Sequence, residues 1–419
     1  MNAAWKTVRI GDLGRIVTGR TPSSERPDEF GNVHPFITPS DIDNTTKFAK
    51  TERYLSEAGA TTLRNAALPA NAVCVVCIGA TIGKVIMTDR PSFTNQQINS
   101  VIVDRSRFDP SYVYYLCKAI PDTFQIFAGG AATPIINKTV FSSIKVRVPD
   151  LATQQRMATL LSSLDDLIAN NQGRVALLES MAEEIYREWF VRMRFPGWAD
   201  TPTFKGLPVG WRLQRLSDVA EVNARSVRRG AEPEVVSYLD ISSVGTNEIA
   251  SPTVVPFEEA PGRARRLAFD GDIIWSSVRP GNKTYCLILD PPENLVVSTG
   301  FAVISPKKGT PFTYLSKALT TQEFTDQMVT VAKGSAYPAT SFDDFERAEL
   351  VWPSEHLLEK YHELVEPMLR QVSALRKQCE QMSKQRDALL PRLISGKLRI
   401  DHLDIQFPPS MKVEQAQAA

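Results

Sequence analysis

The side chains best suited to chemistry in this 419-residue sequence are arginines, amides and hydroxyls in segments rich in glycine and proline. TGRTPSSER (18–26) places two arginines among small hydroxyl residues, and TNQQINS (94–100) groups three amides. Arginine concentrates in the second half, in NARSVRR (223–229), GRARR (262–266) and SSVRPGNK (276–283). Arginine and lysine bind phosphates and guanine edges, whereas asparagine and glutamine bind adenine edges. These segments therefore predict contacts with DNA.

Two further segments resemble each other in composition. GGAATPIINK (129–138) and KGSAYPATS (333–341) both combine glycine, hydroxyls and one lysine. Solvated surface is the alternative interpretation for any single cluster, but recurrence at related places in both halves favours DNA binding. We predict the following DNA-binding residues: Arg20, Thr21, Asn95, Gln96, Gln97 and Lys138 in the first half, and Arg225, Arg228, Arg279, Lys283, Lys333 and Tyr337 in the second.

Motifs that could carry catalysis are incomplete. GATIGK (79–84) has three residues between glycine and GK where a phosphate-binding loop needs four, and no Ser or Thr follows it. DPPE (290–293) lacks the aromatic residue that an amino-methyltransferase stacks on its target base. Cys74 and Cys77 form a lone CxxC in an apolar run, which favours buried strand cysteines over a metal site. We therefore expect no catalytic site, no metal and no cofactor.

Composition is that of an ordinary water-soluble protein. The formal net charge is +1, so a chain that contacts DNA would leave much of the phosphate binding to another subunit. Five cysteines are an odd, sparse set that is typical of the reducing cytoplasm. The sequence contains no run of about 18 apolar residues, so no membrane span is expected. It also starts without the apolar region of a secretory signal.

The sequence repeats once. Trp5 in WKTVRIGDLGRI corresponds to Trp211 in WRLQRLSDVAEV, 206 residues later. IKVRVP and AELVWP end at prolines 204 residues apart, Pro149 and Pro353. The order and offset of such matches persist over most of each half, which indicates two tandem copies of one unit.

Each copy changes from short strands to one long helix. Residues 1–150 and 211–352 contain short β-branched runs bounded by turn-forming clusters, which predicts compact, mostly β domains. After each of the two prolines, apolar residues recur in heptads, as expected for a coiled-coil helix. Asn171 is a polar member of the first apolar seam, and Arg386 interrupts the second. Pro367 should kink the second helix or delay its start.

We therefore predict an α+β fold in which two mostly β domains are separated by two long antiparallel helices with a pseudo-two-fold repeat. A lone helix with an apolar stripe needs a partner, and the other helix supplies one of similar length. The predicted boundaries are 1–150 for the first recognition domain, 151–194 for the first helix, 195–352 for the linker and second domain, 353–400 for the second helix and 401–419 for a C-terminal tail.

This combination resembles the specificity subunit of type I restriction-modification enzymes over essentially the whole chain. The most specific matching strings are VPDLATQQRMATLLSSLDDLI (148–168) and LPVGWRLQRLSDV (207–219). GATIGKV, GDIIWSSVRPGNK and STGFAVI are also similar to family strings. The second copy departs from the family where LVWPSEHLLEKYHELV replaces the usual Pro-x-x-x-Gln-Gln pattern.

The resemblance implies a non-catalytic subunit with two target-recognition domains that each bind half of a split double-stranded DNA sequence. It also implies that two modification subunits dock on the helices, and that restriction subunits join through them. Two alternatives stay open. A self-contained DNA methyltransferase predicts methyl-donor binding by the isolated chain. A scaffold that recognises no sequence predicts that exchanging either β domain leaves DNA binding unchanged.

Overall fold

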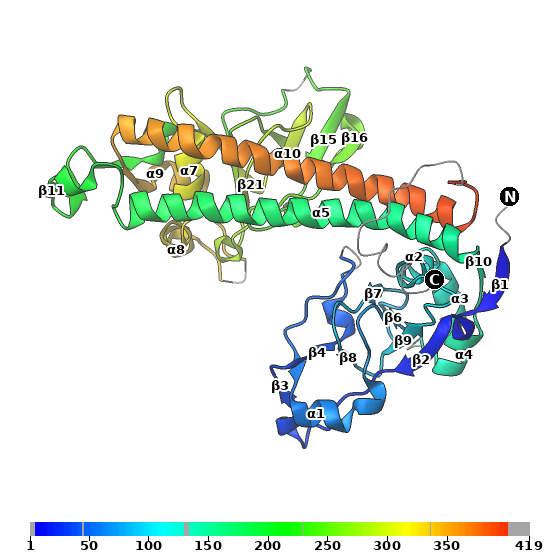
Figure 1. The fold of residues 1–419 in the computed structure, drawn as a ribbon. Coiled ribbons are helices and arrows are strands. Elements are labelled where there is room, and N and C mark those ends of the chain that lie inside the picture. Colours follow the sequence, from blue (N-terminus) through cyan, green and yellow to red (C-terminus); the bar gives the residue numbers. More distant parts are fainter. Residues whose placement is uncertain (1–4, 44–45, 130–133, 229, 336, 401–419) are drawn as a thin grey trace. The chain divides into compact units, whose positions relative to one another are not determined.

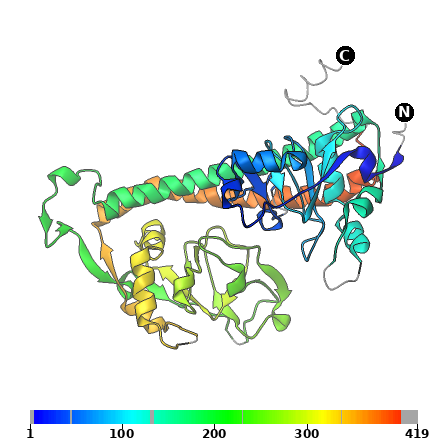
Figure 2. The ribbon, with the colours of Figure 1, turned by 90° about the horizontal axis from the view of Figure 1, so that it is seen from below.

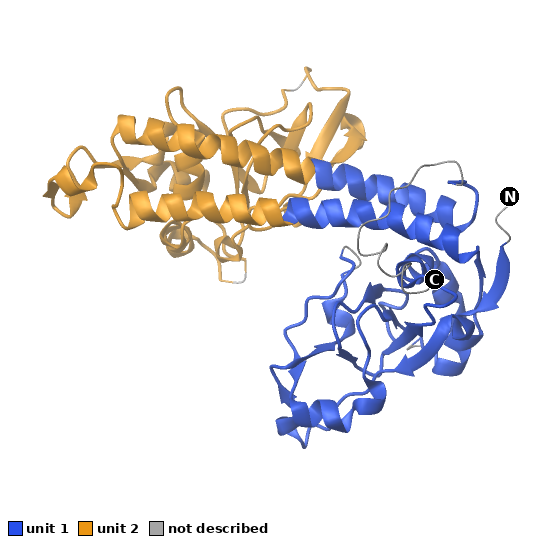
Figure 3. Cartoon of the chain, viewed as in Figure 1, with its two compact units in different colours: residues 1–172, 378–419 blue, residues 173–377 orange. Residues whose placement is uncertain are grey.

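The computed structural model describes residues 5–43, 46–129, 134–228, 230–335 and 337–400. The chain forms two compact units, one made of residues 1–172 and 378–419 and the other of residues 173–377 (Figure 3). The division falls within both long helices, so each unit contains the start of one helix and the end of the other. Within these ranges, no helix is long and apolar enough to cross a bilayer.

The first unit contains two small sheets and a separate strand pair (Figure 1). Its central sheet is built on β6, whose VCVV sequence is buried along its whole length, as expected for β-branched residues inside a sheet. The central sheet has the order β2 (Gly14–Thr18), β9 (Ile98–Val103), β6 (Val73–Val76) and β7 (Val85–Met87). The second sheet has the order β3 (Phe30–Gly31), β5 (Tyr54–Leu55), β4 (His34–Ile37) and β8 (Phe93–Thr94), and β1 (Lys6–Arg9) pairs with β10 (Lys145–Val148).

Short helices cover this core. The buried face of α2 packs into the main apolar cluster of the unit through Tyr112 and Leu116. The Asp109 carboxylate accepts a hydrogen bond from the Tyr112 amide and so caps the start of α2. Cys74 and Cys77 are buried free thiols, as predicted, and burial raises the pKa of Cys77 to about 11. The helices are α1 (Glu57–Thr62), α2 (Pro110–Lys118), α3 (Pro121–Ala128) and α4 (Lys138–Ser143).

The central sheet of the second unit has the same strand order as that of the first, in agreement with the predicted tandem repeat, whereas the other sheet differs at its edges. In the second unit, the central sheet has the order β14 (Ala220–Val222), β21 (Phe301–Pro306), β18 (Ile273–Ser276) and β19 (Tyr285–Leu287). The other sheet has the order β16 (Thr253–Pro256), β15 (Val235–Leu239), β20 (Leu295–Ser298) and β17 (Ala264–Leu267). β13 (Arg212–Arg215) pairs with β22 (Glu349–Trp352), and the helices are α6 (Leu216–Val219), α7 (Phe312–Ala318), α8 (Gln322–Val331) and α9 (Phe342–Arg347). A hairpin of β11 (Thr203–Phe204) and β12 (Leu207–Pro208) lies in the segment between the two copies.

The two long helices are α5 (Leu151–Tyr186) and α10 (Glu355–Ile394), which lie side by side in Figures 1 and 2. They run antiparallel within each unit. In the first, Asn171 bonds to Gln378, and in the second, Val175 packs with Val372. α10 starts 12 residues before Pro367, so the prediction that this proline could delay the helix was wrong. The α+β fold with two small-sheeted domains and two long antiparallel helices is confirmed.

Candidate nucleic-acid interface

In the second unit, two loops join into one surface that we call the second platform, made of residues 277–283, 332–335 and 337–340. Ser277 at the end of β18 accepts a hydrogen bond from the Thr340 amide (2.8 Å), and the Arg279 amide donates to the Pro338 carbonyl (2.7 Å). Lys333 and Ala339 exchange two backbone hydrogen bonds of 2.9 Å. The first two bonds join residues that lie 63 and 59 positions apart in the sequence.

The second platform carries an arginine stacked on a tyrosine. The Arg279 guanidinium carbon lies 4.8 Å from the centroid of the Tyr337 ring, and Tyr337 is 61% exposed. A guanidinium on an aromatic face keeps its N–H edge available, which is the geometry needed to bind a guanine edge bidentately. Lys333 is exposed and Lys283 is half-exposed on the same loops. The structure thus gathers four of the six predicted residues of the second half.

The first unit has an equivalent surface, the first platform, made of residues 77–83 and 134–138. Cys77 accepts a hydrogen bond from the Ile136 amide (2.8 Å), and the Gly79 amide donates to the Pro134 carbonyl (3.1 Å). Lys138 is exposed at the start of α4, behind the N-cap Asn137. Residues 130–133 of the GGAATPIINK segment lie outside the described residues.

The other predicted residues of the first half gather beside the first platform. The Thr21 hydroxyl donates to the Gln96 side-chain oxygen at 2.5 Å, and both residues are exposed. The carbonyl of Gln97 accepts a hydrogen bond from the Cys77 amide (2.7 Å), which joins residues 95–97 to the platform. Asn95 is buried and its amide donates to the Gln97 side chain (3.0 Å), so its side chain shapes the turn. The adjacent Arg20 is exposed, and its backbone amide is held by the carbonyl of Thr94.

Two predicted residues lie apart from the second platform loops. Arg225 forms an ion pair with Asp272 at 2.9 Å, and its guanidinium carbon lies 4.2 Å from the centroid of the Phe269 ring. Asp272 is 2% exposed, and burial raises its pKa even though Arg225 acts in the opposite direction. Arg225 therefore neutralises a buried carboxylate. Arg228 is exposed, and its carbonyl accepts a hydrogen bond from the Ala231 amide.

Arg266, which stands within the GRARR cluster, was not among the residues chosen from the sequence. It lies on β17 and its guanidinium carbon is 4.2 Å from the centroid of the Phe342 ring. The pairing of β17 with β20 shifts register between Ala264 and Arg266, so Arg265 lies at an irregularity of the strand. Simple alternation in the sequence therefore does not distinguish the two arginines.

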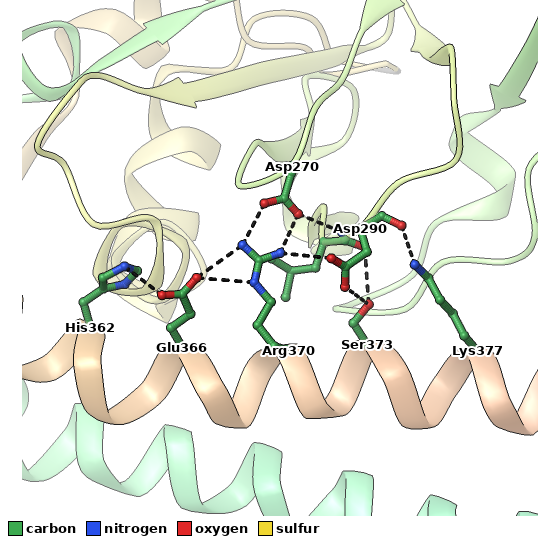
Figure 4. A network of polar contacts seen from close by, with 8 residues as sticks. Asp270, Asp290, His362, Glu366, Arg370, Ser373 and Lys377 are labelled. Atoms are coloured by element: carbon green, nitrogen blue, oxygen red, sulfur yellow. Dashed lines mark hydrogen bonds and ion pairs between the residues drawn. The ribbon is translucent and has the colours of Figure 1, made fainter.

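An ion-pair network anchors the second β domain to α10 (Figure 4). Arg370 on α10 donates to both oxygens of Asp270, at 2.6 and 2.7 Å, and also pairs with Asp290 at 3.3 Å. Ser373, one turn further along, donates to the other oxygen of Asp290 (3.1 Å). The hydrogen bonds from Arg370 hold the pKa of Asp270 below its ordinary value. This anchor fixes the loops that follow β17 and β19 against the helix.

The first β domain is held to α5 by a different arrangement. The Lys47 ammonium donates to the hydroxyls of Ser111 (3.1 Å) and Ser162 (3.2 Å). Burial lowers the pKa of Lys47, and nearby carboxylates, Asp166 foremost, act in the opposite direction. Within the described ranges, no three histidine, cysteine or carboxylate residues gather into a possible metal site.

Comparison with known proteins gives this geometry a context. A family model described as "Type I restriction modification DNA specificity domain" matches residues 2–180. The MjaIX specificity subunit of Methanocaldococcus jannaschii is 25% identical over 435 residues, which cover 95% of this chain and 94% of that subunit. By these matches the chain is similar to type I restriction-modification specificity subunits. The HindI specificity subunit of Haemophilus influenzae is 37% identical over 148 residues, 35% of this chain and 32% of that subunit.

A solved specificity subunit shares the fold. The type I S subunit from M. genitalium matches with a TM-score of 0.63 at 14% identity, over 94% of this chain and 96% of that one. The relatives favour the predicted role, DNA recognition within a type I restriction-modification complex, over the methyltransferase and scaffold alternatives. The first platform lies inside the segment matched by the model of the DNA specificity domain.

Proposed function

We propose that each platform of this chain binds one half of a bipartite DNA target. The observation that carries the proposal is the recurrence of one loop pairing in both units with different side chains. The bond from Gly79 to Pro134 and the bond from Arg279 to Pro338 occupy the same place in the two copies. A common backbone with divergent loop residues would give two similar surfaces that bind different base sequences on one duplex.

The boundaries that we assign to these parts follow the repeat. The first recognition domain comprises residues 1–150, and the linker and second domain comprise residues 195–352. The helices of 151–194 and 353–400 act as the spacer, followed by the tail of 401–419. Half-sites bound on one face of a duplex would lie about one helical turn, ~34 Å, apart.

The proposed partners follow from what the chain has and lacks. With a net charge of +1, it would supply base recognition while two modification subunits, docked on the helices, supply much of the phosphate binding. Restriction subunits would join through the modification subunits. In this scheme the chain is non-catalytic. Its predicted DNA-binding residues are Arg20, Thr21, Asn95, Gln96, Gln97, Lys138, Arg225, Arg228, Arg279, Lys283, Lys333 and Tyr337. The exposed residues of the two platforms are the strongest candidates among them.

The spacer role is tested by lengthening the helix pair. Four residues inserted into α5 near Gly173, and four into the facing part of α10 near Lys377, add ~6 Å to each helix. We expect the gap between the two half-sites to grow by one or two base pairs, measured by mapping methylated sites in DNA from cells that carry the chain and its modification subunits. The matched control inserts the same four residues between β11 and β12. An unchanged gap in the helix variant would contradict the spacer role.

A further inference from the structure

Arg266 lies beside the second platform on an aromatic residue of the same segment. Its guanidinium carbon is 4.2 Å from the centroid of the Phe342 ring, and Phe342 is the first residue of α9, directly after the N-cap Ser341. Tyr337, on which Arg279 stacks, is five residues earlier. Arg266 on β17 and Arg279 in the loop after β18 therefore stack on the two aromatic rings of one short segment, Tyr337 and Phe342.

The guanidinium of Arg266 lacks the carboxylate partners that Arg225 and Arg263 have in the same domain. Its Nε is buried without a hydrogen-bond partner among the described residues. Arg225 pairs with Asp272 and Arg263 pairs with Asp240, whereas no carboxylate lies within ion-pair distance of Arg266 in the same ranges. Burial alone lowers the pKa of Arg266. The buried Nε without an acceptor is unfavourable in the free protein, and an incoming acceptor could use the two terminal nitrogens of the same guanidinium, which are not buried in this way.

We propose that Arg266 is a second base-recognition residue of the second platform, and that it donates to the edge of a guanine. This inference rests on the proposed function. The stack on Phe342 fixes the plane of the guanidinium, and planar, bidentate donation to O6 and N7 is how arginine distinguishes guanine from other bases. Phosphate contacts suit the more exposed cations around it, such as Arg228 and Lys333.

The test uses the full chain assembled with its modification subunits, with Arg266→Met, Arg266→Lys and the matched control Arg265→Met. Arg265 is the adjacent residue, lies 5.1 Å from the Phe257 ring and donates to the Ala264 carbonyl. The probes are a duplex with the mapped target site and the set of its single-base variants. The melting temperature of each free variant is measured in parallel.

For Arg266→Met we expect a melting temperature equal to or above that of the unmodified chain, because an unpaired half-buried charge is removed. Affinity for the target should fall about 5- to 150-fold, with discrimination lost at one G·C pair. Arg266→Lys should lose the same discrimination because lysine lacks the planar fork. Arg265→Met should keep the full binding profile.

Three results would overturn the inference. The first is an equal loss of affinity for all duplexes, which would make Arg266 a phosphate contact. The second is a lower melting temperature with an unchanged binding profile, which would make it a structural brace. The third is the same base-specific loss in Arg265→Met. If the unmodified complex binds every duplex equally, the proposed function fails as well. If the unmodified complex discriminates between the duplexes and the Arg266→Met variant discriminates to the same degree, only this inference fails.

Discussion

The two units share one backbone plan but attach their β domains to the long helices with opposite charges. In the first unit the cation is Lys47 in the β domain, and it faces Asp166 and its neighbours on α5. In the second unit the cation is Arg370 on α10, and it binds Asp270 and Asp290 in the β domain. Asp166 and Arg370 are equivalent positions, 204 residues apart. The cation that holds the β domain to the helix therefore comes from the β domain in the first unit and from the helix in the second.

The platforms differ in a similar way. Gly79 and Arg279 both have left-handed backbones, with φ of 91° and 48°, and both donate to a proline carbonyl. Glycine adopts this conformation freely, whereas a non-glycine residue there is strained by about 1–3 kcal/mol. Strain that persists in an exposed loop commonly marks a functional position. The difference indicates that the second platform places a side chain where the first leaves only backbone.

The largest expected effect concerns two ion pairs between α5 and α10, one in each unit. Arg386 forms a buried ion pair with Asp165 (2.6 Å; side chains 6% and 9% exposed), whereas Arg376 pairs with Glu179 at 2.7 Å with side chains more than a third exposed. Arg386→Met should lower the free energy of unfolding by about 3–5 kcal/mol, because Asp165 stays buried without its cation partner, although it still accepts a hydrogen bond from the Tyr115 hydroxyl.

Arg376→Met should lower the free energy of unfolding by only about 1 kcal/mol or less, since water screens an exposed pair. Denaturant unfolding of the full chain measures both variants, and hydrogen exchange locates the affected segments. Equal losses would show that burial does not distinguish the two pairs.

The next effect concerns the platforms themselves. Arg279→Gly gives the second platform the glycine that the first platform has at Gly79. It should weaken DNA binding by about 1–3 kcal/mol at one base position. The stability of the fold should not fall, because the substitution relieves the strained backbone. The control Lys205→Gly relieves another left-handed residue (φ 49°), which lies between β11 and β12, and should leave binding unchanged. Duplex binding by the assembled complex measures both; a uniform loss over all sequences for Arg279→Gly would make Arg279 a phosphate contact.

A smaller effect is expected at the second anchor. Arg370→Met removes the bidentate bond to Asp270 and should destabilise the second unit by about 1–2 kcal/mol, because the pair is only partly buried. Hydrogen exchange should rise at residues 269–272 and 289–291, with the exposed Lys384→Met on the same helix as control. Unchanged exchange in these loops would show that Arg370 does not hold the domain.

The smallest effect is a pH dependence of this anchor. Because Arg370 lowers the pKa of Asp270, the ionised carboxylate stabilises the fold above its ordinary pKa, and this contribution is lost as pH falls through the lowered value. The difference in unfolding free energy between the unmodified chain and Asp270→Asn should therefore be under about 1 kcal/mol at pH 6 and shrink towards pH 3. A difference that grows on acidification would contradict the assigned sign.

The sequence predicts the repeat and the long helices, because they depend on periodicity and on recurrence between the copies. For the same reason it selects the loop residues that the structure gathers on the second platform, Arg279, Lys283, Lys333 and Tyr337. The pairing of Arg225 with Asp272 could not be predicted, since the two are 47 residues apart and meet only when the sheet forms. Arg386 interrupts the apolar seam in the sequence, but only the structure shows that Asp165 neutralises it. Composition identifies the loops that gather, whereas burial and pairing decide which of their side chains are free for DNA.

The account's central claim is that two platforms bind two separate halves of one target. The most direct measurement maps methylated sites in DNA from cells that carry the modification subunits with either the unmodified chain or a variant with both Arg279→Gly and Tyr337→Ala. The account predicts a split motif for the unmodified chain, and for the variant the same motif with one half relaxed and the other half intact. A continuous motif, or a variant in which both halves change together, would contradict it.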